Sequence, residues 1–149
     1  MTKVDSHANV VCACLAGLAI ALVVVGMVSD TVLRHLVQIV PAVAALAFVR
    51  WRPAIGAYAA LPIFVFWLLI VGLIWLFLVG LSRIANGHYT IAEIVSTFVM
   101  AVCCARGAIR ALPMGRPAPV AARFAAFAGF AAFQIAAMWI SFTTSIANR

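Results

Sequence analysis

Charged residues are scarce in this chain: they make up 9% of its 149 residues, and only three of them are acidic. Soluble domains are about 25% charged, and disordered chains combine high charge with low hydrophobicity. Hydrophobic residues instead account for 68% of the sequence. A soluble globular domain and a disordered chain are therefore both excluded, because neither can keep so much apolar surface away from water. The composition predicts an all-α integral membrane protein.

Motifs of enzyme chemistry are also missing. The sequence has no glycine-rich phosphate loop, no His-Glu-x-x-His motif, no nucleophile elbow and no paired carboxylates. Its four cysteines, Cys12, Cys14, Cys103 and Cys104, include no Cys-x-x-Cys pair. On helices, the first two thiols would point about 200° apart and the last two about 100° apart. We therefore expect free, buried thiols and no metal site, and nothing in the sequence indicates an enzyme.

Long apolar runs dominate what is present. A helix of about 20 apolar residues crosses a hydrocarbon core of about 30 Å. The first run is too long for the core of a signal peptide, so we interpret it as a retained span. The sequence predicts one polytopic transmembrane domain over residues 1–149, a bundle of about five helices at residues 10–28, 32–49, 54–81, 91–112 and 124–147.

The second and third runs leave alternatives open. The second contains polar residues and Pro41, so a rival topology has four spans and a re-entrant second segment. The third run is longer than a single crossing requires, so its helix tilts, bends at Pro62, or begins in the membrane interface.

Basic residues predict the orientation of the chain. The chain has ten Lys and Arg residues and three acidic residues, which gives a net charge of +7. Seven basic residues would lie on the side of the N-terminus and three on the other, so the positive-inside rule predicts a cytoplasmic N-terminus and an outside C-terminus in a bacterial inner membrane. Nucleic acid is not an expected partner, because the basic residues do not form one patch. Contacts with anionic lipid headgroups are expected for Arg50, Arg52, Arg106, Arg110, Arg116 and Arg123.

Small residues at helical spacing predict where helices pack. Ala13, Gly17 and Ala21 recur at every fourth position of the first span, which allows close approach of another helix. Ala125 and Gly129 lie in a groove left by the Phe-Ala-Ala repeat of the last span. This groove either packs within the bundle or docks a partner membrane protein or a second copy of the chain.

A polar cluster is expected near the outer ends of the spans. Ionisable groups within membrane spans are costly and by default mark functional sites. Asp30, Arg34 and Gln38 are spaced by four residues, which places them on one helix face. The predicted cluster consists of Arg34, His35, Gln38, His88 and Glu93.

Glu93 has two interpretations. Thr90 and Glu93 have the spacing of a capping box, in which Thr90 is the N-cap of the fourth span. Alternatively, Glu93 is a functional carboxylate that pairs with Arg34. The pairing requires the second and fourth helices to be neighbours at their outer ends, and we expect that they are.

Three functions are compatible with these features. The leading hypothesis is a structural or accessory subunit of a membrane complex, because the loops are short and catalytic groups are missing. The second is a small transporter or channel that uses the outer polar cluster. The third is a haem or redox protein that uses His35 and His88, although no cofactor is predicted because no third ligand or spacing motif accompanies them.

Overall fold

The computed structural model describes residues 3–81, 89–115 and 118–143. Each helix is long and apolar enough to cross a membrane, and the described residues contain no strand. The prediction of five long apolar helices is therefore confirmed. The helices are α1 (Lys3–Val28), α2 (Val32–Trp51), α3 (Pro53–Leu78), α4 (Ile91–Gly115) and α5 (Val120–Ser141).

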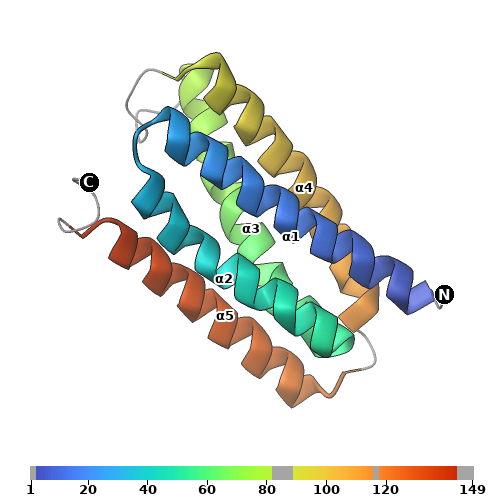
Figure 1. Ribbon diagram of the computed structural model, residues 1–149. Helices are drawn as coiled ribbons and strands as arrows, with labels where there is room; N and C mark the ends of the chain where they lie inside the picture. Colours follow the sequence, from blue (N-terminus) through green and yellow to red (C-terminus); the bar gives the residue numbers. More distant parts are fainter. Residues whose placement is uncertain (1–2, 82–88, 116–117, 144–149) are drawn as a thin grey trace.

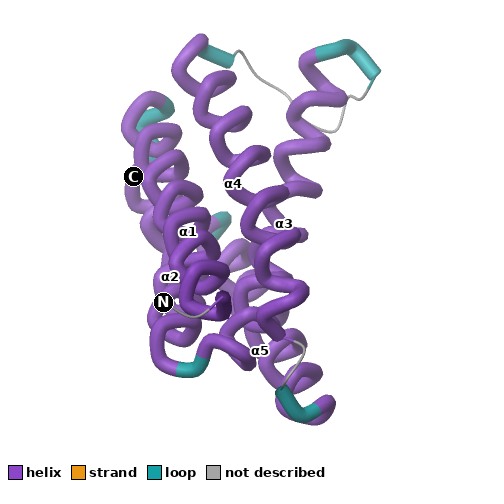
Figure 2. The backbone as a smooth tube through the Cα atoms, turned by 90° about the vertical axis from the view of Figure 1, so that its right-hand side faces the viewer, coloured by secondary structure: helices purple, strands orange, loops and turns teal. Residues whose placement is uncertain are grey.

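The first four helices form a closed ring. Each of α1, α2 and α3 packs against the helix that follows it, and α4 packs back against α1 (Figure 1). At the end of the bundle that holds residues 29–31, here called the turn end, α3 and α4 extend beyond the turn between α1 and α2 (Figure 2). Because α1 and α3 separate α2 from α4, the expectation that the second and fourth helices are packed neighbours is wrong.

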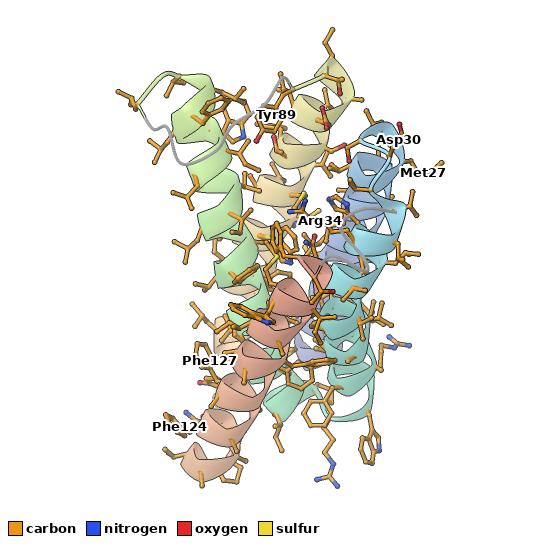
Figure 3. The ribbon with its side chains drawn as sticks, turned by 90° about the vertical axis from the view of Figure 1, so that its left-hand side faces the viewer. Met27, Asp30, Arg34, Tyr89, Phe124 and Phe127 are labelled. Atoms are coloured by element: carbon orange, nitrogen blue, oxygen red, sulfur yellow. The ribbon has the colours of Figure 1, made fainter. Side chains whose placement is uncertain are left out.

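Helix α5 lies outside this ring, in the groove between α2 and α3. Figure 3 looks onto this groove, where α5 ends beside Arg34 and does not reach the level at which α3 and α4 end. One side of α5 is therefore packed on the bundle, and its other sides carry exposed apolar residues such as Phe124, Ile135 and Trp139.

Prolines do not interrupt the helices of the ring. α2 continues through Pro41 and α3 through Pro62. α2 is one continuous helix of 20 residues, as five spans require, and not the broken segment that the rival topology with a re-entrant second segment would need. α4 likewise continues past Pro113 to Gly115, beyond the predicted end at residue 112. Pro113 has no N–H to donate to the carbonyl oxygen of Ile109, so α4 continues past it with one backbone hydrogen bond fewer.

Several other helix ends differ from the predicted spans. α1 begins at Lys3, seven residues before the apolar run, and its Asn9 accepts a 3.1 Å hydrogen bond from Nη1 of Arg50. α3 ends at Leu78, before the predicted residue 81. α5 begins at Val120 and ends at Ser141, where the predicted span was 124–147. Polar residues extend helices beyond the membrane core, so hydropathy marks the apolar part and not the helix end.

The core of the ring depends on small residues. A Cβ atom added to Gly107 of α4 would collide with the ring of Phe64 on α3, which is fully buried. A Cβ atom on Gly17 of α1 would lie 2.8 Å from Sγ of Cys103 on α4. The absence of side chains at these two glycines lets α4 approach α3 on one side and α1 on the other.

The predicted small-residue faces have different outcomes. Gly17 and the buried Ala21 pack within the bundle, whereas Ala13 is exposed. On α5, Ala125 and Gly129 are both exposed, and a Cβ atom on Gly129 would meet nothing within 4 Å. The interpretation of this second groove as an internal packing face is therefore wrong. The opposite side of α5 is the side that packs on α2 and α3.

Candidate functional site

A cavity of about 260 Å³ lies at the turn end of the bundle, and residues from all five helices line it. We call it the Arg34 cavity. Three residues of the predicted cluster, Arg34, His35 and Gln38, belong to its lining. The lining also includes five polar residues that the predicted cluster lacks: Ser29, Thr31, Trp67, Tyr89 and Thr97.

Arg34 is the central charge of the cavity. Its side chain points into the bundle, toward the end of α5 (Figure 3). The guanidinium carbon lies 3.8 Å from the ring centroid of Phe142, a cation–π contact. Its Nε atom is buried and has no hydrogen-bond acceptor in the described chain. No carboxylate is among the described residues that line the cavity.

The turn between α1 and α2 forms a chain of hydroxyl groups on one wall. Ser29 Oγ donates to the carbonyl oxygen of Val25 over 2.7 Å and lies 2.6 Å from Thr31 Oγ1. Thr31 Oγ1 in turn lies 3.1 Å from Nδ1 of His35. Thr31 holds the N-cap position of α2, yet its hydroxyl makes no capping hydrogen bond. It fixes the imidazole instead.

Asp30 does not join Arg34 and Gln38 on one helix face. It lies in the turn before α2 begins, with a φ of 53°, and its side chain is exposed. Aspartate is among the few residues other than glycine that tolerate this left-handed conformation. The spacing of four residues therefore relates only Arg34 and Gln38, because the helix does not extend back to residue 30.

Gln38 connects α2 to the end of α5. Its Nε2 donates to Oγ of Ser141 over 2.9 Å and lies 3.3 Å from the sulfur of Met138. Ser141 Oγ itself donates to the carbonyl oxygen of Met138 over 2.7 Å. Gln38 and Ser141 are both buried. This pair holds the C-terminal end of α5 against α2, beside the cavity.

Trp67 and Tyr89 complete the polar lining from α3 and from the residues before α4. The indole nitrogen of Trp67 is buried and has no acceptor in the described ranges. The ring of Tyr89 packs against Phe77, with centroids 6.0 Å apart. Burial and, to a lesser degree, the charge of Glu93 raise the pKa of Tyr89. Its hydroxyl therefore keeps its proton at neutral pH and remains a hydrogen-bond donor.

Glu93 caps α4 and does not line the cavity. The backbone N–H of Thr90 donates to Oε2 of Glu93 over 2.7 Å, and the N–H of Glu93 donates to Oγ1 of Thr90 over 3.3 Å. These are the two reciprocal bonds of a capping box. The alternative, a contact between Glu93 and Arg34, does not occur between these two described side chains.

The remaining predicted candidates lie elsewhere. His88 and Arg116 are outside the described residues. In the described parts of the chain, no three side chains of His, Cys, Asp or Glu come together as a metal site would require. The four cysteines have free thiols, and two of them, Cys14 and Cys104, are buried.

The basic residues predicted to contact lipid divide into two groups. Arg50, Arg52, Arg106 and Arg110 are exposed. Arg123 is half-buried in the first turn of α5, where its Nε donates to the carbonyl oxygen of Ala118 and its guanidinium lies 5.7 Å from the ring centroid of Tyr58. Arg123 therefore also contributes to the packing of α5 on α3.

The Arg34 cavity offers one cationic donor group, a second donor from Trp67, and hydroxyl groups that can donate or accept. Arg34 and the Trp67 indole have donor groups without acceptors in the described chain, and Arg34 adds a positive charge. Charge-assisted hydrogen bonds from such a set favour an anion over a cation.

Comparisons of the chain with models of protein families, with curated proteins and with solved structures give no match.

Proposed function

We propose that this chain is a small membrane transport protein whose Arg34 cavity binds a small anion. One observation carries the proposal: an arginine inside a bundle of apolar helices has no carboxylate partner among the residues that line its cavity. Arg34 is half-buried and its Nε atom is buried, and a charge that is removed from water without a partner is unfavourable. An anion that enters the cavity would supply the missing charge and the missing acceptors.

The size of the cavity limits the anion. About 30 Å³ is the volume of one water molecule in the liquid, so about 260 Å³ holds an inorganic anion or a short carboxylate with some of its water. The volume lies just below the range of about 300–1,000 Å³ that is usual for sites of drug-sized ligands. We therefore propose a substrate smaller than a nucleotide.

The proposed setting is a bacterial inner membrane, with the N-terminus in the cytoplasm and the cavity open toward the outside. Support comes from the distribution of basic residues. Arg50 and Arg52, at the junction between α2 and α3, are exposed at the end where α1 begins, and Arg50 contacts Asn9 there. Basic residues are enriched on the cytoplasmic side of membrane proteins.

Anion binding is tested with the purified chain in mild detergent. The probes are the sodium salts of chloride, nitrate, phosphate and acetate, and the readout is the temperature of unfolding at constant ionic strength. A bound anion stabilises the fold by about 2.7 kcal/mol at 100 times its Kd. At least one probe should raise the unfolding temperature of the wild-type chain, and that anion should cross liposome membranes that contain the protein.

Two arginine variants provide the comparison. Arg34→Gln should abolish both the thermal shift and the flux, because it removes the charge from the cavity. Arg110→Gln is the matched control, since Arg110 is exposed on α4 and does not line the cavity. Equal anion responses in the wild type and in Arg34→Gln, or no response in either, would contradict the proposal.

A second candidate function is a structural or accessory subunit of a membrane complex. The exposed groove at Ala125 and Gly129 favours it, because small residues permit a partner helix to approach closely. The native mass in mild detergent tests this role. A stoichiometric partner or a second copy that is lost with Gly129→Leu would support the subunit, and a monomer would contradict it.

A further inference from the structure

The polar residues of α5 share the side that faces the bundle. Between Val120 and Ser141, side chains other than hydrophobic residues and glycine occur at three positions: Arg123, Gln134 and Ser141. Their spacings of 11 and 7 residues correspond to about three and two helical turns. Arg123 is half-buried, whereas Gln134 and Ser141 are 1% and 0% exposed. The helix therefore directs its polar groups toward α2 and α3 and not toward lipid.

Gln134 is the least satisfied of these side chains. Both its Nε2 and its Oε1 are buried, and neither has a hydrogen-bond partner in the part of the chain that the structure describes. It lines a crevice of about 180 Å³ between α3 and α5, whose other walls include Pro62, Phe66 and Phe127. Buried amides in proteins are nearly always paired. Both the donor and the acceptor of this amide are therefore available to a group from outside the described chain.

Gln134 lies on the same side of α5 as the residues that meet the Arg34 cavity. It precedes Met138 by one helical turn and Ser141 by two turns on the same side of α5. Met138 and Ser141 are the residues that Gln38 contacts, and Gln38 and Met138 both line the cavity. Along the interface of α5 with α2 and α3, the polar residues therefore occur in the order Arg34, Gln38 and Gln134, counted from the turn end inward.

The interface between α1 and α4 has a different character. It contains the contact between Gly17 and Cys103, and it is flanked by the buried residues Leu15, Leu18 and Cys104. These groups offer an anion no strong donor. A polar solute that leaves the Arg34 cavity toward the opposite end of the bundle therefore finds its next donor on α5.

We infer that Gln134 is a second binding site for the transported anion, so that the anion moves along the interface between α5 and the ring. This inference rests on the proposed transport function and adds the route. The amide N–H groups of Gln134 donate hydrogen bonds to the anion after it leaves Arg34. α5 packs on the bundle through one side only, against α2 and α3, so a displacement of α5 opens this interface without disturbing the ring.

The test compares anion binding, anion flux and thermal stability in Gln134→Leu. Replacing an unpaired buried amide by an apolar side chain of similar size removes a desolvation penalty, so the unfolding temperature should rise. The anion that stabilises the wild type should still bind with a Kd within twofold, because the Arg34 cavity is unchanged. Its flux into liposomes should fall at least tenfold.

Two further variants control for side effects. Ala132→Leu changes an exposed position of the same helix and should leave binding and flux at the wild-type level. Gln134→Asn retains the amide on a shorter side chain and should restore part of the flux that Gln134→Leu loses. If Gln134→Leu does not fold, Gln134→Asn still tests the inference. Its amide is displaced by the length of one methylene group, which should slow the anion flux without weakening anion binding at the Arg34 cavity.

The outcomes separate this inference from the proposed function. Wild-type flux in Gln134→Leu would overturn the route and leave the anion site intact. A lower unfolding temperature together with weaker binding would also overturn it, because Gln134 would then be a packing residue. Failure of the wild type to bind any of the four anions would instead overturn the proposed function.

Discussion

At the scale of single residues, Thr90 and Glu93 show how much a local spacing determines. Both partners of the capping box lie within one turn of the same helix, so their contact does not depend on how the helices pack. The structure contains both reciprocal bonds. The carboxylate is thereby occupied at the start of α4, and Arg34 has no acidic partner in the cavity.

The capping box predicts an order of effects. Thr90→Ala should lower the free energy of unfolding by about 1 kcal/mol, because the N-cap oxygen is lost. Glu93→Gln should cost less, because glutamine also serves at the third position of the motif. Reversible unfolding in detergent, followed by circular dichroism, measures both. A larger loss in Glu93→Gln than in Thr90→Ala would show that the negative charge itself matters.

Contacts between residues far apart in the sequence were harder to predict. Arg34, His35 and Gln38 lie within five positions of one helix, and all three line the cavity as one group. The sequence predicts Glu93 in the same cluster because Glu93 and Arg34 lie at the same predicted depth in the membrane. Depth follows from the apolar runs, but the order of the helices around the bundle does not. Trp67 of α3 and Thr97 of α4 line the cavity because of this order. No sequence pattern marks them, so they could not be predicted.

At the scale of elements, the apolar runs predict the helices well and their ends poorly. Within α3 and α4, the close contacts depend on glycines whose surroundings hydropathy does not reveal. Gly107 faces the buried ring of Phe64, whereas Gly72 of α3 is exposed and has nothing within 4 Å of an added Cβ atom. The same residue type therefore has opposite consequences on two neighbouring helices.

These two glycines predict a pair of contrasting variants. Gly107→Ala forces Phe64 or the α4 backbone to move and should destabilise the bundle by about 1–3 kcal/mol. Gly72→Ala meets no obstacle and should be neutral or stabilising by up to about 1 kcal/mol, because alanine favours the helix. Thermal unfolding of both variants under identical detergent conditions is the measurement. Equal losses in the two would mean that the α3–α4 contact is looser than the structure has it.

At the scale of the whole molecule, the bundle combines a ring of four helices with a fifth helix on its outside. The ring buries its apolar core between α1, α2, α3 and α4, and its largest fully buried side chain is Phe64. α5 adds Gln134 and Ser141 to the groove between α2 and α3. The number of helices was predictable from hydropathy. The external position of α5 was not, because the few polar residues on one side of α5 show which side packs but not which helices it packs against.

The orientation of this bundle in the membrane is the last prediction. Alkaline phosphatase is active only outside the cytoplasm, so a fusion at the C-terminus should be active in a bacterial host. A fusion after Arg52 should be inactive, because Arg50 and Arg52 would hold that junction in the cytoplasm. Immunoblots of both fusions control for expression. The reverse pattern of activities would turn the Arg34 cavity toward the cytoplasm, and the anion would then have to be a cytoplasmic solute that the protein exports.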